Sequence, residues 1–503
     1  MTYYHNNHDY YKDIVRGMNV SAYKCYSMIM NELLINDLEK SVGDKIFQIS
    51  AIRFDLLWDT LFWSFFTKIP GSILQDEKMP QYRIVRLIGG QYPLDLLWKI
   101  FFSTQKNKKM CDLLGVNASY NNFKNMDPIL KACSSDYNVD VIFPGGSWKG
   151  LPIYMKNSQY NIIRYFYSGK ISDYVKVYRV ATFLTYKISV LRKIFKKHLE
   201  GYSHKEIDYS TWLFVELIIR AVHDYIFTRR IIIEKKPSCV IVSNDHRIFP
   251  RCTIVNANQL GIPTFHYPHA VMNTTWAYSN IRARKIFVGG NAEKKHLLRM
   301  GYKDRNVIIS GRNISCPSNI TYNNVIAIFL TNYTNSRYYQ LTDDLVKLIL
   351  DTFPDYDVKL QTHPADNIKY YPGIKAMIDS QKIGRSMTYE NQETLKTSFI
   401  NIVPYNSNIC LDSIYNGKLT VAYNLFDAMP SIPWEQYGAC LFSRTALEVI
   451  SNVQKIKDSP ELREKLRKGC NKMKKDYFSD ISKKEHIKLV LESISKELNH
   501  KNQ

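Results

Sequence analysis

The sequence lacks the motifs of several large enzyme classes. It contains no GxxxxGK[ST] loop, no GxGxxG after a strand, no GxSxG and no HExxH, which removes the main support for P-loop, NAD-binding, esterase and zincin functions. The 9 cysteines are scattered, without a CxxC pair or a Cys/His spacing typical of zinc sites, so we expect buried free thiols and no structural metal. With 21 glycines, 18 prolines and no short repeat, the chain is neither collagen-like nor a coiled coil.

Long apolar runs are also missing. The most apolar stretch, residues 47–74, is interrupted by Arg53, Asp55, Asp59 and Lys68. Charges at the centre of a bilayer are costly, so this stretch predicts buried helices and not a membrane span. The first residues lack the charged-then-apolar layout of a signal peptide, and we therefore expect a cytoplasmic protein.

Positive charge is present in excess. Among 503 residues, 68 Lys and Arg outnumber 46 Asp and Glu, which gives a formal net charge of +22. The hydrophobic share of 45% is a globular average, and the length allows two to four domains. The charge favours anionic partners, and because no RNA-binding, zinc-finger or helix-turn-helix pattern accompanies it, we expect no nucleic acid.

Two stretches concentrate the basic residues. In residues 187–197, Ile188, Leu191 and Phe195 recur at helical spacing among lysines, and residues 461–475 carry a second basic run. Two interpretations fit both stretches: they are solvated helix faces, or they dock on anionic phospholipid headgroups. The second alternative predicts a peripheral protein at the inner face of the plasma membrane.

Short apolar runs alternate with helix-length segments from residue 239 onward. The first group of runs is 239–243, 264–267, 285–288 and 306–310, and the second is 325–330, 357–361, 400–403 and 419–423. This alternation predicts parallel sheets built from βαβ units, in two doubly wound domains that face each other across a cleft. We expect an N-terminal Rossmann-like domain with a helical elaboration at 1–315, a linker at 316–324, a C-terminal nucleotide-sugar-binding Rossmann-like domain at 325–460 and basic C-terminal helices at 461–503.

Polar residues follow two strands of the second domain. His363 and Pro364 come after the strand 357–361, and the proline restricts the histidine to extended backbone geometry. Asn406, Ser407 and Asn408 lead from the strand 400–403 into a helix, whose N-terminus can be an ordinary cap or bind a phosphate. Three further residues complete the predicted nucleotide site: Asp412 one turn along this helix, Thr331 after the strand 325–330, and Arg312.

Strand ends of the first domain carry an acid and a histidine. Asp245 follows the strand 239–243, and His269 follows the next strand along the chain. A carboxylate or imidazole there can accept a proton from an acceptor hydroxyl, although caps and structural histidines account for the same residues. We expect both to be catalytic, with Asp245 as the general base and His269 as its partner or as a contact to the donor phosphate.

The order of short motifs resembles a family of bacterial surface-polysaccharide transferases. The run Gly261-Ile-Pro-Thr-Phe-His-Tyr-Pro-His269-Ala is similar to their G-[IV]-P-x-x-x-x-x-H-G segment. Lys285-Ile-Phe-Val-Gly-Gly290, Val307-Ile-Ile-Ser-Gly311 and His363-Pro364 follow in the order that this family shows. Members include capsule Kdo transferases, bacterial sialyl- and polysialyltransferases, and CDP-glycerol glycerophosphotransferases. Two positions depart from the pattern: Ala270 stands where Gly is usual, and Asp412 where Glu is common.

The resemblance implies the GT-B fold and an inverting, metal-independent glycosyltransferase of capsule, O-antigen or lipopolysaccharide synthesis. Its donor would be a nucleotide-activated sugar, CMP-linked and of the Kdo or sialic acid type, and its acceptor a growing glycan or lipid-linked glycan. His363 and Pro364 would contact the nucleotide phosphate. No cofactor and no metal are expected. The alternatives are a CDP-glycerol or CDP-ribitol phosphotransferase, a UDP- or GDP-sugar GT-B transferase, and a non-catalytic nucleotide- or glycan-binding subunit.

Overall fold

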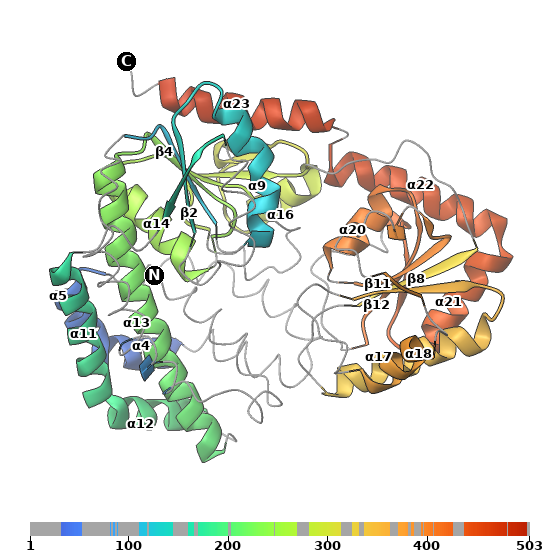
Figure 1. Ribbon diagram of the computed structural model, residues 1–503, viewed down its shortest axis with the longest axis horizontal. Coiled ribbons are helices and arrows are strands. Elements are labelled where there is room, and N and C mark those ends of the chain that lie inside the picture. The colour runs from blue at the N-terminus through green and yellow to red at the C-terminus, as the bar shows by residue number, and fades with distance from the viewer. Residues whose placement is uncertain are drawn as a thin grey trace.

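The apolar runs of the first part of the chain form a parallel sheet of seven strands in the computed structural model (Figure 1). The strands are β1 (Leu113–Val116), β2 (Val139–Phe143), β3 (Asn161–Arg164), β4 (Cys239–Val242), β5 (Thr264–His266), β6 (Lys285–Val288) and β7 (Val307–Ile309). Their spatial order is β3-β2-β1-β4-β5-β6-β7. Every residue of β1, β2, β4 and β5 is buried, as expected for a parallel sheet with helices on both faces.

The later apolar runs form a second parallel sheet of six strands. These are β8 (Val325–Phe329), β9 (Asp357–Gln361), β10 (Gly384–Ser386), β11 (Ile400–Pro404), β12 (Leu419–Tyr423) and β13 (Leu441–Ser443), in the order β10-β9-β8-β11-β12-β13. Strands β8, β11 and β12 are buried along their whole length, and they form the centre of the second core. The predicted pair of doubly wound units is therefore present.

The structure describes residues 32–52, 81, 84–85, 88, 110–117, 120–143, 159–164, 170–199, 203–245, 247–268, 281–312, 324–330, 336–362, 371–380, 384–386, 394–395, 397–405, 407–425, 437–479 and 481–499. Most of the apolar stretch 47–74 and nearly all of the predicted linker lie outside these residues. Within them, no helix is both long and apolar enough to cross a membrane. The seven described cysteines are free and buried.

Helices cover both faces of each sheet. The first unit contains α4 (Glu32–Leu38), the π-helix η1 (Glu39–Gly43), α5 (Asp44–Ser50), α9 (Tyr120–Cys133), α11 (Ile171–Tyr186), α12 (Ile188–His198), α13 (His204–Lys235), α14 (Ile248–Gln259), α16 (Asn291–Arg299) and the 3₁₀ turn η6 (Asp304–Asn306). The second unit contains α17 (Ser336–Thr352), α18 (Pro372–Asp379), α20 (Asn408–Tyr415), α21 (Ala446–Asp458) and α22 (Pro460–Tyr477).

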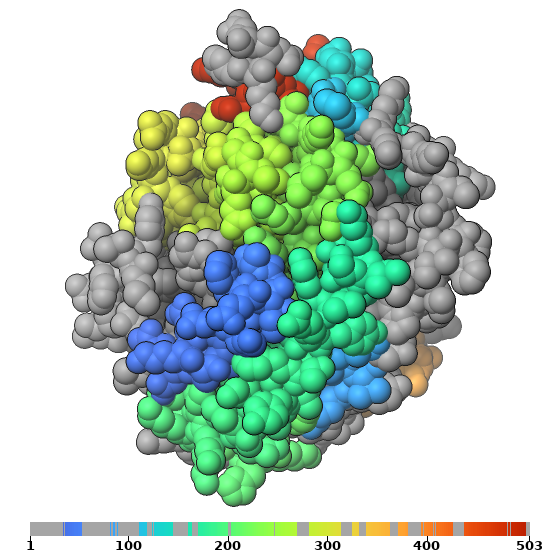
Figure 2. Space-filling view, turned by 90° about the vertical axis from the view of Figure 1, so that its left-hand side faces the viewer, coloured from blue at the N-terminus to red at the C-terminus, as the bar shows by residue number. Residues whose placement is uncertain are grey.

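The helical elaboration of the first unit is organised around α13, which has 32 residues. A capping box starts this helix, because the Ser203 hydroxyl accepts from the Glu206 N–H and the Glu206 carboxylate accepts from the Ser203 N–H. It ends at Lys236, which has a left-handed φ of 46°. Helices α4, α5, α11 and α12 form an outer layer at this side of the molecule (Figures 1 and 2).

The two C-terminal helices belong to different units. The Met473 and Tyr477 side chains of α22 are buried in the core of the second sheet. The last helix, α23 (Lys483–Asn499), lies above the first sheet beside α9 and buries Val490, Ile494 and Leu498 against it (Figure 1). The chain therefore returns to the first unit after completing the second.

Candidate functional site

Each sheet has one place where the chain reverses its direction of winding. In the first sheet, β1 leads to β2 on one side, and its other neighbour, β4, leads to β5 on the opposite side. In the second sheet, β8 and β11 have the same relation. Open α/β sheets bind ligands outside the carboxyl ends of strands at such reversals, so these two positions define the candidate site.

In the second unit, the helix α20 begins where β11 ends. Ser407 is its N-cap, and its hydroxyl accepts a hydrogen bond from the N–H of Ile409 at 3.3 Å. No acidic residue occupies the first turn, so the positive end of the helix dipole is not neutralised. The structure thus places Ser407 and the backbone of Asn408 at the reversal, whereas Asn406, His363, Pro364 and Thr331 lie outside the described residues.

Arg312 and Asp412 come from different units and are close in space. Arg312 follows β7 of the first sheet, and its guanidinium pairs with Glu293 of α16. Asp412 lies on α20 of the second unit. Burial raises the pKa of the Asp412 carboxyl to about 7, and the positive charge of Arg312 opposes this rise. Ala292 of α16 also packs against the apolar cluster that contains Ile409 and Ile414 of α20, so the segments after β6 and β7 lie beside α20 and bring the two predicted site residues near each other.

Sequence reasoning missed Glu293, which fixes Arg312 and Gly289 on the first-unit side of this junction. Its carboxylate accepts from the N–H of Gly289 at 2.7 Å and pairs with Arg312. Gly289 and Gly290 follow β6 and lie against the backbone of Asp476 and Tyr477 at the end of α22. The negative end of α22 thus lies close to the N-terminus of α16, which is a favourable arrangement of helix dipoles. The Gly289-Gly290 pair before α16 was the sequence feature that could have indicated this close approach.

The raised pKa of Asp412 predicts a pH-dependent stability. Its pKa rises from 3.8 to about 7 on folding, so between these values the folded chain binds a proton that the unfolded chain has lost. The free energy of unfolding therefore falls as the pH rises through this window, and the full loss is present above pH 7. We expect Asp412→Asn to melt at a higher temperature than the parent at pH 8 and at about the same temperature at pH 4.

Melting curves between pH 4 and pH 8 test this expectation. The matched control is Asp355→Asn, because Asp355 is exposed on the turn before β9 of the same unit. Parallel curves for Asp412→Asn and the parent across this range would contradict the assignment.

Asp245 lies at the carboxyl end of β4, as predicted. Its carboxylate is bound by other groups of the first unit. One oxygen pairs with Nε of Arg251 at 2.7 Å, and the other accepts from the N–H groups of Arg282 and Ala283 at 2.6 and 3.0 Å. The exposed fractions of Asp245 and Arg251 are both 0%. This geometry fixes the segment before β6 against α14, and it is a poor arrangement for accepting a substrate proton. His269 lies outside the described residues.

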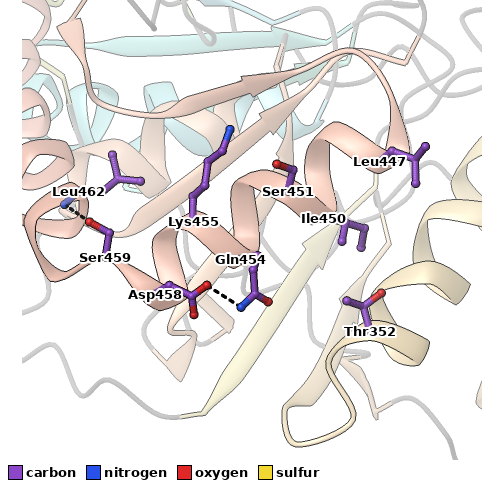
Figure 3. Close-up of a pocket in the computed structure, with 9 residues that line it drawn as sticks. All are labelled: Thr352, Leu447, Ile450, Ser451, Gln454, Lys455, Asp458, Ser459 and Leu462. Carbon is purple, nitrogen blue, oxygen red and sulfur yellow. Dashed lines mark hydrogen bonds between the residues drawn. The ribbon is translucent and has the colours of Figure 1, made fainter.

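A surface groove of about 620 Å³ lies on the second unit (Figure 3). It is lined mainly by α21, with Thr352 on one side and Leu462 on the other. None of the predicted site residues lines it. Among the described residues, no group of acidic, histidine and cysteine side chains could hold a metal ion.

Comparison with known proteins identifies the fold. No protein-family model and no curated protein sequence matches the chain. Among solved structures, the UDP-GlcNAc 2-epimerase from Neisseria meningitidis bound to UDP-GlcNAc matches with a TM-score of 0.52 and 12% identity, over 76% of this chain and 99% of that one. S. aureus MnaA with UDP matches with a TM-score of 0.45 and 12% identity, over 71% of this chain and 91% of that one. Anabaena Alr3699/HepE in complex with UDP and glucose matches with a TM-score of 0.46 and 8% identity, over 76% of this chain and 99% of that one.

The likeness to the Neisseria structure concerns the fold. Together with the two parallel sheets, it confirms the predicted GT-B architecture. The finer resemblance to Kdo transferases, sialyltransferases and CDP-glycerol phosphotransferases stays a prediction.

Proposed function

We propose that this GT-B chain is an enzyme that binds a UDP-sugar and transfers the sugar to a glycan or lipid-linked acceptor in the synthesis of a bacterial surface polysaccharide. The observation that carries the proposal is the N-terminus of α20 at the winding reversal of the second sheet, with Ser407 as its cap and no acidic residue in its first turn. A helix N-terminus in this position suits the phosphates of a nucleotide.

The choice of nucleotide departs from the main prediction of the sequence. The motif order favoured a CMP-linked donor, with UDP-sugars as an alternative. The Neisseria structure with the same fold contains UDP-GlcNAc, which supports the UDP alternative. The capsule, O-antigen or lipopolysaccharide product, the inverting stereochemistry and the independence from metal remain parts of the proposal that rest on the sequence.

The internal contacts of Asp245 alter the proposed division of catalytic roles. Both of its carboxylate oxygens are held inside the first unit, so we assign Asp245 a positioning role. His269 is then the proposed base that accepts the proton of the acceptor hydroxyl. In the second unit, Ser407 and Asn408 would hold the nucleotide phosphates together with His363, and Arg312 would supply positive charge from the first unit.

Thermal shift with nucleotides tests the proposal directly. A ligand at 100 times its dissociation constant stabilises the protein by about 2.7 kcal/mol. We expect UDP to raise the melting temperature more than CMP, CDP or GDP, and Ser407→Ala to weaken UDP binding. Thr445→Ala is the matched control, because the Thr445 hydroxyl also caps a helix of the same unit, α21, by accepting from the N–H of Glu448. Each cap loss costs about 1 kcal/mol of stability, so only the effect on UDP separates them.

The products of turnover separate transfer from other chemistry on the same fold. Transfer releases UDP and extends an acceptor, whereas an epimerase, which the Neisseria protein is, returns a UDP-sugar of changed configuration. A chain that binds CMP or CDP and not UDP contradicts the donor assignment. A chain that binds no nucleotide at all contradicts the proposal itself.

We further propose that the corner between α11 and α12 docks on an anionic membrane surface. Tyr186 and Val190 are 77% and 38% exposed, Lys193 and Lys196 of the same corner are also exposed, and α12 contains no acidic residue. Apolar side chains among lysines suit the headgroup region of acidic lipids. The other basic stretch, on α22, buries Leu466, Met473 and Tyr477 and presents mainly charged side chains.

Liposome co-sedimentation with phosphatidylserine vesicles distinguishes the two basic stretches. Each lysine near such a surface contributes about 1 kcal/mol, so Lys193→Gln with Lys196→Gln should weaken binding roughly 30-fold. The matched control removes two exposed lysines of α22, Lys468→Gln with Lys472→Gln, and should change binding little. Equal losses in both variants would show a response to net charge only. Binding that is insensitive to salt and lipid charge would rule out the docking surface.

A further inference from the structure

Asn117 is the first residue beyond β1, at the point where the first sheet reverses its winding. Its N–H still donates to the carbonyl of Ile142 in β2, at 3.2 Å. On the other side, the N–H of Ser243 donates to the carbonyl of Val116 at 3.2 Å. The two strand ladders therefore extend to Asn117 and stop there, so this residue sits between the carboxyl ends of β2 and β4.

The alternation of side chains along β1 shows toward which face of the sheet the side chain of Asn117 points. Leu113 is buried with residues of α9 and α23, whereas Leu114 and Val116 belong to the core on the opposite face. Because side chains alternate between faces along a strand, Asn117 points to the same face as Leu113. That face is the one covered by α9, whose N-terminus at Tyr120 comes only three residues later and has no acidic residue in its first turn.

The amide of Asn117 is buried and has no hydrogen-bond partner. Its exposed fraction is 0%, and neither Oδ1 nor Nδ2 makes a hydrogen bond. Leaving a buried donor and acceptor unpaired lowers the stability of the fold, and a side chain kept in this state calls for an explanation. A second buried asparagine in the same unit is satisfied on its donor side, because Nδ2 of Asn256 donates to Tyr225 and Thr228, while its Oδ1 has no hydrogen-bond partner.

We propose that Asn117 binds the sugar of the nucleotide-sugar through hydroxyl groups. This inference rests on the proposed function. The amide offers one accepting and one donating group side by side, and a pair of sugar hydroxyls can satisfy both. A phosphate carries only acceptors and leaves Oδ1 unpaired. The exposed fraction of 0% refers to the ligand-free chain, so a sugar that reaches the amide replaces atoms that now cover it.

The substitution Asn117→Leu separates a binding role from a structural one. Removing an unsatisfied amide for an apolar side chain of similar size should leave the melting temperature of the free protein unchanged or raise it. Sugar recognition should weaken in the same variant. We measure thermal shifts with UDP alone, UDP-GlcNAc, UDP-GalNAc, UDP-glucose and UDP-galactose, and expect the affinity gained from the sugar to fall about 3- to 10-fold, as for the loss of a neutral hydrogen bond.

Asn256→Leu is the matched control, because it makes the same substitution at a buried asparagine whose Nδ2 donates two hydrogen bonds. It should lower the melting temperature and leave the ratio of UDP-sugar to UDP affinity unchanged. The inference is wrong if Asn117→Leu also destabilises the free protein, if it weakens UDP itself, or if no sugar adds to the shift that UDP gives the parent. A parent that fails to bind UDP contradicts the proposed function instead.

Discussion

Replacing Gly290 by alanine is expected to lower the melting temperature by roughly 6–12 °C, which corresponds to about 3 kcal/mol. A Cβ atom at this position would lie 2.3 Å from the carbonyl oxygen of Asp476 and 2.6 Å from the carbonyl carbon of Tyr477. Both are backbone atoms, so no side-chain rotation relieves the clash. The backbone of Gly290 is extended, with φ of −163°, and suits alanine equally well, so the expected cost is steric.

The clash would separate α16 from the end of α22 and disturb the pairing of Glu293 with Arg312. We therefore expect Gly290→Ala to weaken UDP binding as well as stability, whereas Gly261→Ala provides the control. A Cβ at Gly261 meets nothing within 4 Å, and only its left-handed φ of 74° opposes alanine. That conformation costs about 1–2 kcal/mol. If Gly290→Ala melts at or above Gly261→Ala, the close approach of the two units at this point is refuted.

Between residues 239 and 423, every strand except β10 (Gly384–Ser386) could be predicted, because each is an apolar run bounded by glycine, proline or polar residues. The strand β1 could not, although it lies at the centre of the first sheet. It has four residues, and one of them is Gly115, where a Cβ would lie 2.9 Å from Leu130 of α9. Its identity as a strand depends on packing against a helix that comes later in the chain, and a local pattern does not carry this information.

The return of α23 to the first unit has a similar cause. Val490, Ile494 and Leu498 recur at helical spacing and predict an amphipathic helix, but either sheet could accept it. Two tertiary hydrogen bonds resolve the choice, because Nδ1–H of His486 donates to the carbonyl of Ser310 at 2.7 Å and its Nε2 lies 2.8 Å from the hydroxyl of Tyr267, both in the first unit. No local sequence pattern shows which of the two sheets α23 packs against.

In the candidate site, too, the position of a residue along the chain was predictable, whereas its tertiary contacts were not. The position of Asp245 at a strand end was predictable from the apolar run before it. Its contact with the backbone at Arg282 joins segments 37 residues apart, and only the fold brings them together. Asn117 carried no pattern at all, because a single asparagine after a short strand is common. Its interest arises from burial without a hydrogen-bond partner.

Removing the guanidinium of Arg251 is expected to be the most destabilising single change in the first unit. In Arg251→Met, the carboxylate of Asp245 stays buried without its counter-ion, and such changes typically cost about 3–5 kcal/mol. Asp245→Asn should cost less, because the side-chain oxygen can still accept from the N–H groups of Arg282 and Ala283. The double variant Asp245→Asn with Arg251→Met should be more stable than Arg251→Met alone, since it buries no unpaired charge.

Chemical denaturation of the four proteins in this cycle gives the coupling energy, with Arg192→Met as the control. Arg192 pairs with Asp208, but both side chains are more than 40% exposed, so its loss should cost less than about 1 kcal/mol. Turnover of Asp245→Asn decides its catalytic role. A general base contributes about 10²–10⁴-fold to the rate, so a loss of this size in a fully folded variant would restore Asp245 as the base. If activity instead follows the fraction of folded protein, Asp245 acts by holding the segment before β6 in place.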